Sequence, residues 1–208
     1  GGSIQPAFDK NGLSHQPMME NANAEAKLYE CVLKAGCTWQ PELFPFRKKI
    51  QMFFFTNETG YIQSETQVWK IEQAVFVPDY DREAITIHAG KEDLHFLHIV
   101  GDLNDYDRAT MERWCIKLPR YRNFHQCVQY TEGFTGDAGS NVTSRLLVEG
   151  RGCGRWSMGW NNGEGPTFIG EHIHKHLVQW YYVLPDGFFT YIAGGTREDM
   201  GPGSLSYT

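Results

Sequence analysis

The 208-residue chain is expected to fold as an all-β protein with a sandwich or barrel architecture. Short apolar runs recur along it at roughly ten-residue intervals with turn residues between them, a spacing typical of such folds. Its 22 glycines also indicate many turns. Only the stretch 109–119, ATMERWCIKLP, has helical character, and Pro119 is expected to end it.

The first series of strands is expected between residues 26 and 101. The segment that begins at Ala26, AKLYECVLKAGCTW, is predicted to be a strand followed by a turn. The most apolar strand is predicted from Ile50 to Phe55, within RKKIQMFFFTNETGYIQ. Further short strands are predicted at 66–71, 73–80, 83–90 and 94–101.

A second series of strands begins near Gln126, and residues 1–25 are expected to form an irregular arm because they are polar with few apolar positions. Both halves place a Gly-Cys turn with a nearby Trp before an aromatic strand, which indicates an internal duplication of about 125 residues. The strands of the second series are predicted at 142–150, 154–163, 167–176, 178–187, 188–195 and 203–208.

Composition excludes several classes of function and favours a location. A formal net charge of −6 argues against nucleic-acid binding, which needs clustered Lys and Arg. The sequence contains no run of about 18 apolar residues, so no membrane span is predicted. The N-terminus also lacks the layout of a signal peptide. Five cysteines without CxxC spacing are expected to be free thiols in a reducing compartment, so we predict a cytoplasmic protein.

Three histidines stand at alternate positions in the segment 170–187, GEHIHKHLVQWYYVLPDG. On a strand, alternation places His172, His174 and His176 on one face. Neighbours on that face are about 7 Å apart at Cα, so two imidazoles can converge on one metal ion, whereas the outer pair is about 13 Å apart. We therefore predict His172 and His174 as ligands, and His176 as a rim residue, a second-shell donor or a substitute ligand.

The spacing around these histidines resembles the first motif of the cupin superfamily. The matching pieces are Gly165, His172-Ile173-His174, Gln179 and Gly187, and GGTREDMGPGSLSYT is similar to the approach to the second motif. The resemblance covers roughly residues 26–208. It implies two tandem jelly-roll (double-stranded β-helix) barrels. The expected limits are an N-terminal arm at 1–25, a degenerate cupin at 26–120 and a metal-binding cupin at 121–208.

The resemblance also has departures. Gln179 stands where the family has a Glu ligand, and it still offers a carbonyl oxygen. The sequence stops at Thr208, before the expected third His, so either it is truncated there or the site lacks that ligand. In the first half the segment in place of the metal motif has no histidine, and Glu83 stands where the family has its second-motif His.

The resemblance implies a divalent transition metal, Mn, Fe, Ni or Zn, because imidazole suits all of these. It further implies a metal-dependent enzyme acting on a small polar metabolite by isomerase, lyase, amidohydrolase or oxygenase chemistry, with a metal-bound substrate anion. The alternative is a non-catalytic, small-molecule-binding or regulatory bicupin. No catalytic residue is assigned.

Three residues are predicted to contact the substrate, and a partner is also expected. Arg197 can clamp a carboxylate bidentately, and Trp156 and Tyr182 can wall a pocket. A homodimer is expected, since cupin barrels commonly pair their edge strands.

His95 and His98 are three residues apart in the sequence, so they are predicted to face opposite sides of a strand, one in the core and one at the surface.

Overall fold

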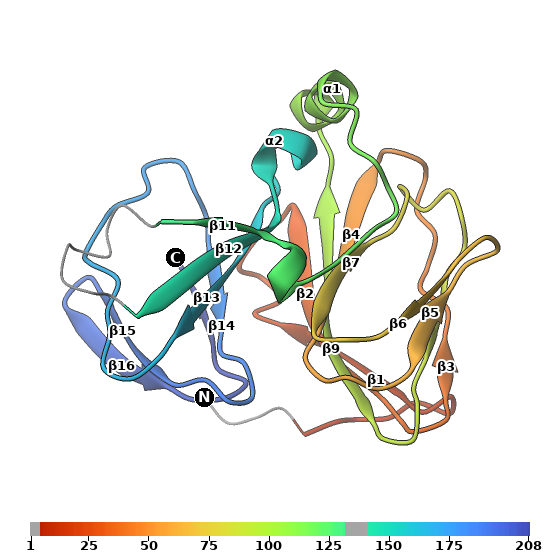
Figure 1. Ribbon diagram of the computed structural model, residues 1–208, viewed down its shortest axis with the longest axis horizontal. Helices are drawn as coiled ribbons and strands as arrows, with labels where there is room; N and C mark the ends of the chain where they lie inside the picture. The colour runs from red at the N-terminus through yellow and green to blue at the C-terminus, as the bar shows by residue number, and fades with distance from the viewer. Residues whose placement is uncertain (1–4, 132–140) are drawn as a thin grey trace.

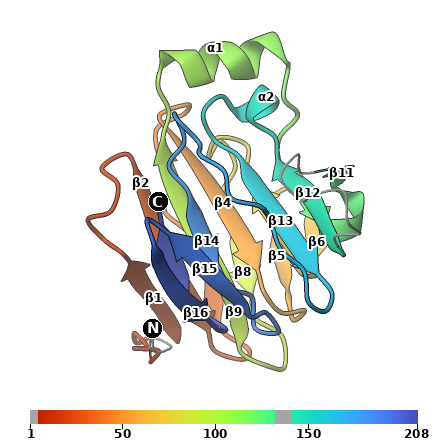
Figure 2. The same cartoon turned by 90° about the vertical axis from the view of Figure 1, so that its left-hand side faces the viewer.

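The computed structural model of the protein describes residues 5–131 and 141–208, and strands make up most of its regular structure (Figure 1). Strands β1 to β10 form one lobe, and β11 to β17 form a second lobe beside it. Helices α1 (Asp105–Arg113) and α2 (Gly150–Cys153) lie together at one end of the molecule, as Figures 1 and 2 both show. The prediction of an all-β fold is confirmed.

The first lobe consists of two antiparallel sheets. The larger sheet has the order β1-β2-β9-β4-β7-β10, and the smaller has the order β3-β8-β5-β6. The strands of the larger sheet are β1 (Leu13–Met18), β2 (Ala26–Leu33), β4 (Lys49–Phe55), β7 (Ala74–Val77), β9 (Leu94–Asp102) and β10 (Arg120–Asn123). The strands of the smaller sheet are β3 (Thr38–Trp39), β5 (Tyr61–Gln63), β6 (Val68–Lys70) and β8 (Thr86–His88).

The second lobe is divided among smaller antiparallel sheets. One has the order β11-β12-β13, and two further pairs are β14-β17 and β15-β16. Their strands are β11 (Val128–Tyr130), β12 (Val142–Val148), β13 (Met158–Gly163), β14 (Trp180–Tyr182), β15 (Phe189–Ala193), β16 (Thr196–Met200) and β17 (Leu205–Tyr207).

The larger sheet of the first lobe is covered on both faces. Since side chains alternate along a strand, Phe53 and Phe55 of β4 point into the first lobe, where they pack with Ile62 and Ile87 of the smaller sheet. The intervening residues of β4 form a second cluster with Leu147 and neighbouring side chains of the second lobe. Burial on both faces explains the unbroken apolar run from Met52 to Phe55 in β4.

The junction between the lobes is closely packed at Gly101 of β9. A Cβ atom added there would lie 2.5 Å from the Trp156 ring carbon Cη2. The Trp156 indole Nε1 donates to the Asp102 carbonyl at 3.2 Å. On the same junction, the rings of Phe54 and Trp160 meet edge to face at 5.5 Å. Aromatic side chains of the second lobe therefore lie directly on the sheet of the first.

Several predicted elements need correction. Residues 13–18, placed in an irregular arm, form strand β1 and pair with β2, so part of the arm belongs to the sheet. The helix begins at Asp105 rather than 109, because Asn104 and Asp107 form a capping box, and it ends at Arg113 rather than at Pro119. The segment 167–176 is not a strand. Strand β10 crosses the expected division at 120 and 121, and the domain limits themselves stay a prediction.

Two other observations concern the cysteines and the predicted absence of a membrane span. All five cysteines are free thiols, as expected from their odd number and spacing. Neither helix in the described residues is long and apolar enough to cross a membrane.

The Gly101 packing gives a testable prediction. Gly101→Ala should lower the free energy of unfolding by about 1–3 kcal/mol, because the new methyl group overlaps the Trp156 ring. Gly201→Ala is the matched control, since its Cβ would meet no atom within 4 Å. Chemical denaturation of both variants measures the effect, and equal stability of the two would contradict the packing argument.

Candidate functional site

His172 and His174 lie together in the irregular segment that precedes β14. Their ring centroids are 4.7 Å apart, and the rings are nearly perpendicular. The Nδ1 atom of His172 is 2.7 Å from the Gly170 carbonyl oxygen. A carbonyl can only accept, so Nδ1 carries a proton. His172 is half-buried and His174 is exposed.

The other predicted ligands do not complete the set. His176 is exposed in a turn. The Gln179 carbonyl oxygen accepts a hydrogen bond from the Tyr181 hydroxyl at 2.8 Å. The backbone of Gln179 pairs with that of Thr208, which extends the β14–β17 ladder by one residue. Within residues 5–131 and 141–208, no group of three or more His, Cys, Asp or Glu side chains could hold a metal.

The three predicted substrate-binding residues come from different parts of the second lobe. Arg197 is exposed on β16. Trp156 packs on the larger sheet at the junction of the lobes. The Tyr182 hydroxyl donates to the Glu30 carboxylate of β2 at 3.3 Å, and burial, then Glu30, raises the pKa of Tyr182. Trp156 and Tyr182 therefore join the two lobes, and their role in substrate binding stays a prediction.

A buried polar chain inside the first lobe was not anticipated as a unit. His15 Nε2 is 2.9 Å from His98 Nδ1, and His98 Nε2 is 2.7 Å from the Gln51 carbonyl oxygen. The Gln51 amide then donates to Asp81 Oδ1 at 2.6 Å and to the Glu42 carbonyl at 2.9 Å. The chain thus runs from half-buried His15 to buried Asp81.

Donor and acceptor chemistry assigns the protons in this chain. Both partners of the Gln51 nitrogen are oxygens that accept, one a carboxylate and one a carbonyl, which settles the orientation of the amide. Its oxygen must therefore accept from His98 Nε2–H. His98 Nδ1 is then the acceptor for His15 Nε2–H. His15, His98 and Gln51 consequently donate in the same direction, and Asp81 accepts the last hydrogen bond.

Aromatic rings enclose the two histidines. The His98 ring stacks on Phe53 at 4.6 Å, and the His15 ring stacks on Tyr29 at 4.0 Å. Trp39, from the opposite sheet, contacts both histidines at 5.4 and 5.5 Å. His98 is 4 % exposed, so the expectation that one of His95 and His98 lies in the core is confirmed, and His95 is the exposed one.

A comparison with solved structures identifies the architecture. A protein of Pseudomonas aeruginosa described as glyoxylate-induced superposes with a TM-score of 0.69 at 13% identity, over 99% of this chain and 73% of that one. That protein is a bicupin, and the superposition runs through both lobes. The chain has the bicupin fold. At 13% identity the likeness establishes the fold and nothing further.

Single cupin domains align with about half of the bicupin chain. The Cnp3 cupin domain of Schizosaccharomyces pombe matches at 14% identity and a TM-score of 0.39, over 56% of this chain and 78% of its own. A Cupin_2 domain of an XRE family transcriptional regulator from Enterobacter cloacae matches at 8% identity and 0.37, over 45% and 99%. No protein-family model and no curated protein matches the sequence.

The N-terminal cupin differs from its expected description. It holds two ring-enclosed histidines, although the segment in place of its metal motif has none. Glu83, expected in the place of a ligand, is half-buried and accepts from the Thr66 backbone N–H at 2.9 Å. His15 and His98 are 83 residues apart and meet only because β1 and β9 both pair with β2. A single sequence does not reveal the order in which strands pair, so the contact between these two histidines could not be predicted.

Burial shifts the pKa values of two members of this polar chain, His98 and Asp81, in opposite directions. It lowers the pKa of His98 to about 3, with a smaller contribution from His15. It raises the pKa of Asp81 to about 6, although the hydrogen bond from Gln51 favours the ionised form. The Asp81 Oδ2 atom is buried without a hydrogen-bond partner among the described residues, which agrees with the raised pKa.

These shifts predict how stability depends on pH. Unfolded His98 takes up a proton below pH 6.5 while folded His98 stays neutral to about pH 3, so the free energy of unfolding falls on acidification. Folded Asp81 holds its proton up to about pH 6, against 3.8 for an ordinary Asp, so this group favours folding at acid pH. Asp81→Asn removes the second effect only. Its unfolding free energy should fall more steeply than that of the wild type between pH 6 and 4, by up to about 1.4 kcal/mol per pH unit.

Denaturant titrations at several pH values measure this difference in slope. Asp186→Asn, at an exposed turn residue, is the control and should follow the wild type. Parallel curves for Asp81→Asn and the wild type would show that Asp81 is ionised in the folded protein at pH 5.

Proposed function

We propose that the C-terminal cupin binds a divalent transition metal, Mn, Fe, Ni or Zn, through His172 and His174, and that this bicupin is an enzyme of small polar metabolites. The observation that carries the proposal is the contact between the two imidazole rings, 4.7 Å between centroids. Two imidazoles that bind one ion at about 2.0–2.1 Å, at an angle near 100°, have centroids about 5 Å apart. The pair therefore fits a shared ion without a large rearrangement.

The hydrogen bond of His172 supports the same proposal. Histidines that bind metals usually donate their second ring N–H to a carbonyl or carboxylate, which fixes the tautomer and the orientation of the ring. The bond from His172 Nδ1 to the Gly170 carbonyl has this form. His172 would then be the oriented ligand of the pair and His174 the exposed one.

The donor set favours an accessible, labile site. Two imidazoles are fewer than the three protein ligands usual for catalytic zinc, and Gln179 already accepts from Tyr181. When bound, the metal would supply Lewis acidity to substrate oxygens. In this proposal the chain itself contributes the two imidazoles, their orientation and the small-molecule specificity of the surrounding segment. The proposal covers isomerase, lyase, amidohydrolase and oxygenase chemistry, each through a metal-bound substrate anion.

A metal titration tests the site. Zn²⁺ added to chelator-treated protein should bind with one equivalent by calorimetry. The double variant His172→Ala/His174→Ala should weaken binding on the order of 100-fold or more, because loss of a ligand costs at least as much as loss of its supporting hydrogen bond. His125→Ala, which removes an exposed histidine outside the segment 170–187, is the control and should bind as the wild type does.

The rival function makes the opposite prediction. A bicupin that binds a small molecule without catalysis is favoured by the exposure of His174 and His176. Protein purified without chelators should then contain no stoichiometric metal, and Zn²⁺ affinity should be the same in the double variant and in the wild type. That result would overturn the metal proposal.

A further inference from the structure

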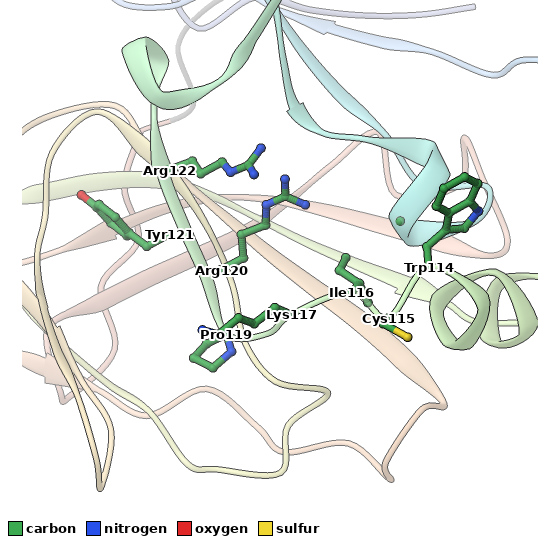
Figure 3. Close-up of a pocket in the computed structure, with 9 residues that line it drawn as sticks. Trp114, Cys115, Ile116, Lys117, Pro119, Arg120, Tyr121 and Arg122 are labelled. Atoms are coloured by element: carbon green, nitrogen blue, oxygen red, sulfur yellow. The ribbon is translucent and has the colours of Figure 1, made fainter.

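A surface pocket lies where the chain passes from α1 into β10, far in sequence from the histidine segment. Its volume is about 430 Å³, and segment 114–122 supplies most of its lining, with Gly152 of α2 beside it (Figure 3). Small-molecule sites commonly have volumes of about 300–1,000 Å³. The pocket thus has the size for a small metabolite.

The pocket is basic. Arg120 and Arg122 alternate on β10, so their side chains leave the same face of the strand, and Figure 3 shows both guanidinium groups on one side of it. Lys117 adds a third cation to the lining, and no acidic residue is among the described lining residues. A ligand in this pocket therefore meets positive charge.

One carboxylate partly neutralises these cations. Glu149 contacts Arg120 at 2.5 Å and Arg122 at 2.8 Å, through different oxygens. Three cations against one carboxylate leave two positive charges. Each guanidinium carries five N–H donors, and a single carboxylate oxygen engages only part of that set. Glu149 therefore holds the two arginines side by side while donors remain for a second anion.

The opposite part of the lining is apolar. Trp114 is 58 % exposed although it is a large aromatic residue, and Ile116 lies between it and the arginines in Figure 3. An exposed indole beside cations provides a surface on which a planar apolar group can stack. Inorganic anions make no use of such a surface.

We infer that this pocket binds a small organic carboxylate, whose anionic group is received by Arg120 and Arg122 and whose apolar body lies against Trp114 and Ile116. The site is separate from the proposed metal site and does not depend on it. Bidentate recognition by arginine favours a carboxylate, and the exposed indole favours a ligand with an apolar part.

Cys115 offers a direct readout of occupancy. Its thiol lines the pocket and is exposed, whereas Cys31, Cys127 and Cys153 are buried and Cys37 is half-buried. A ligand in the pocket should slow the alkylation of Cys115 by iodoacetamide, which is uncharged. Mass spectrometry of the peptide that contains Cys115 measures the rate without interference from the other four cysteines.

The experiment uses three probes on the intact protein: benzoate, its uncharged isostere benzamide, and inorganic phosphate. Benzoate should slow alkylation in a saturable way, and the other two should protect much more weakly. Arg122→Gln should weaken the protection by benzoate about tenfold, as expected for a lost charged hydrogen bond. Arg113→Gln removes the same charge from an exposed residue of α1 outside the pocket and should leave protection unchanged.

Each remaining outcome also decides. Equal protection by benzamide or by phosphate would overturn the assignment of an organic carboxylate. No protection by benzoate in the wild type, or the same protection in Arg122→Gln, would overturn the site. If Arg122→Gln fails to fold, Lys117→Gln, at an exposed position, takes its place and should weaken benzoate protection about threefold, since it removes one of the charges that attract the anion. An unchanged affinity in that variant would likewise overturn the site.

Discussion

Burial of the larger sheet on both faces is the constraint on which the rest of the bicupin depends. One face closes the N-terminal cupin over Phe53, Phe55 and their neighbours, and the other face is the floor on which the second lobe packs. The largest sheet of the second lobe has three strands, and small sheets of this kind are marginal unless they pack on another layer. The C-terminal cupin therefore relies on the N-terminal one for much of its core.

The sequence predicts the parts of this fold that depend on local pattern. The apolar run from Ile50 to Phe55 was expected to be a strand and is one, and most strands of both series lie where they were expected. The capping box at Asn104 and Asp107 was also visible in the sequence, and it would have placed the helix correctly. The contact between Trp156 and Gly101 could not be predicted from local pattern, because the two residues become neighbours only when the two lobes pack together.

The candidate metal site was predicted by a partly wrong argument. His172 and His174 do meet, but in an irregular segment rather than on one strand, so the spacing of two residues rather than strand alternation brings the rings together. Hydrophobic periodicity could not predict the hydrogen-bonded polar chain from His15 to Asp81. It requires the order β1-β2-β9 and an inward turn at Tyr80 and Asp81, both of which have positive φ values, 46° and 59°.

That strained turn bears on why the polar chain persists inside an aromatic barrel. Positive φ costs about 1–3 kcal/mol at a residue other than glycine, and an unpartnered buried carboxylate oxygen adds a further cost. The packing of the barrel does not require the turn or the buried carboxylate, since Phe53, Phe76 and Phe96 already fill the neighbouring interior. The hydrogen bonds run in one direction from His15 to Asp81 and link His15, His98 and Gln51 to the Asp81 Oδ1 atom. This polar chain therefore specifies one arrangement of the strands. A slip of β1 by one residue would turn His15 away from His98 and leave the Nδ1 atom of His98 buried without its donor. The chain thus ties the strand at the edge of the larger sheet to the interior of the barrel.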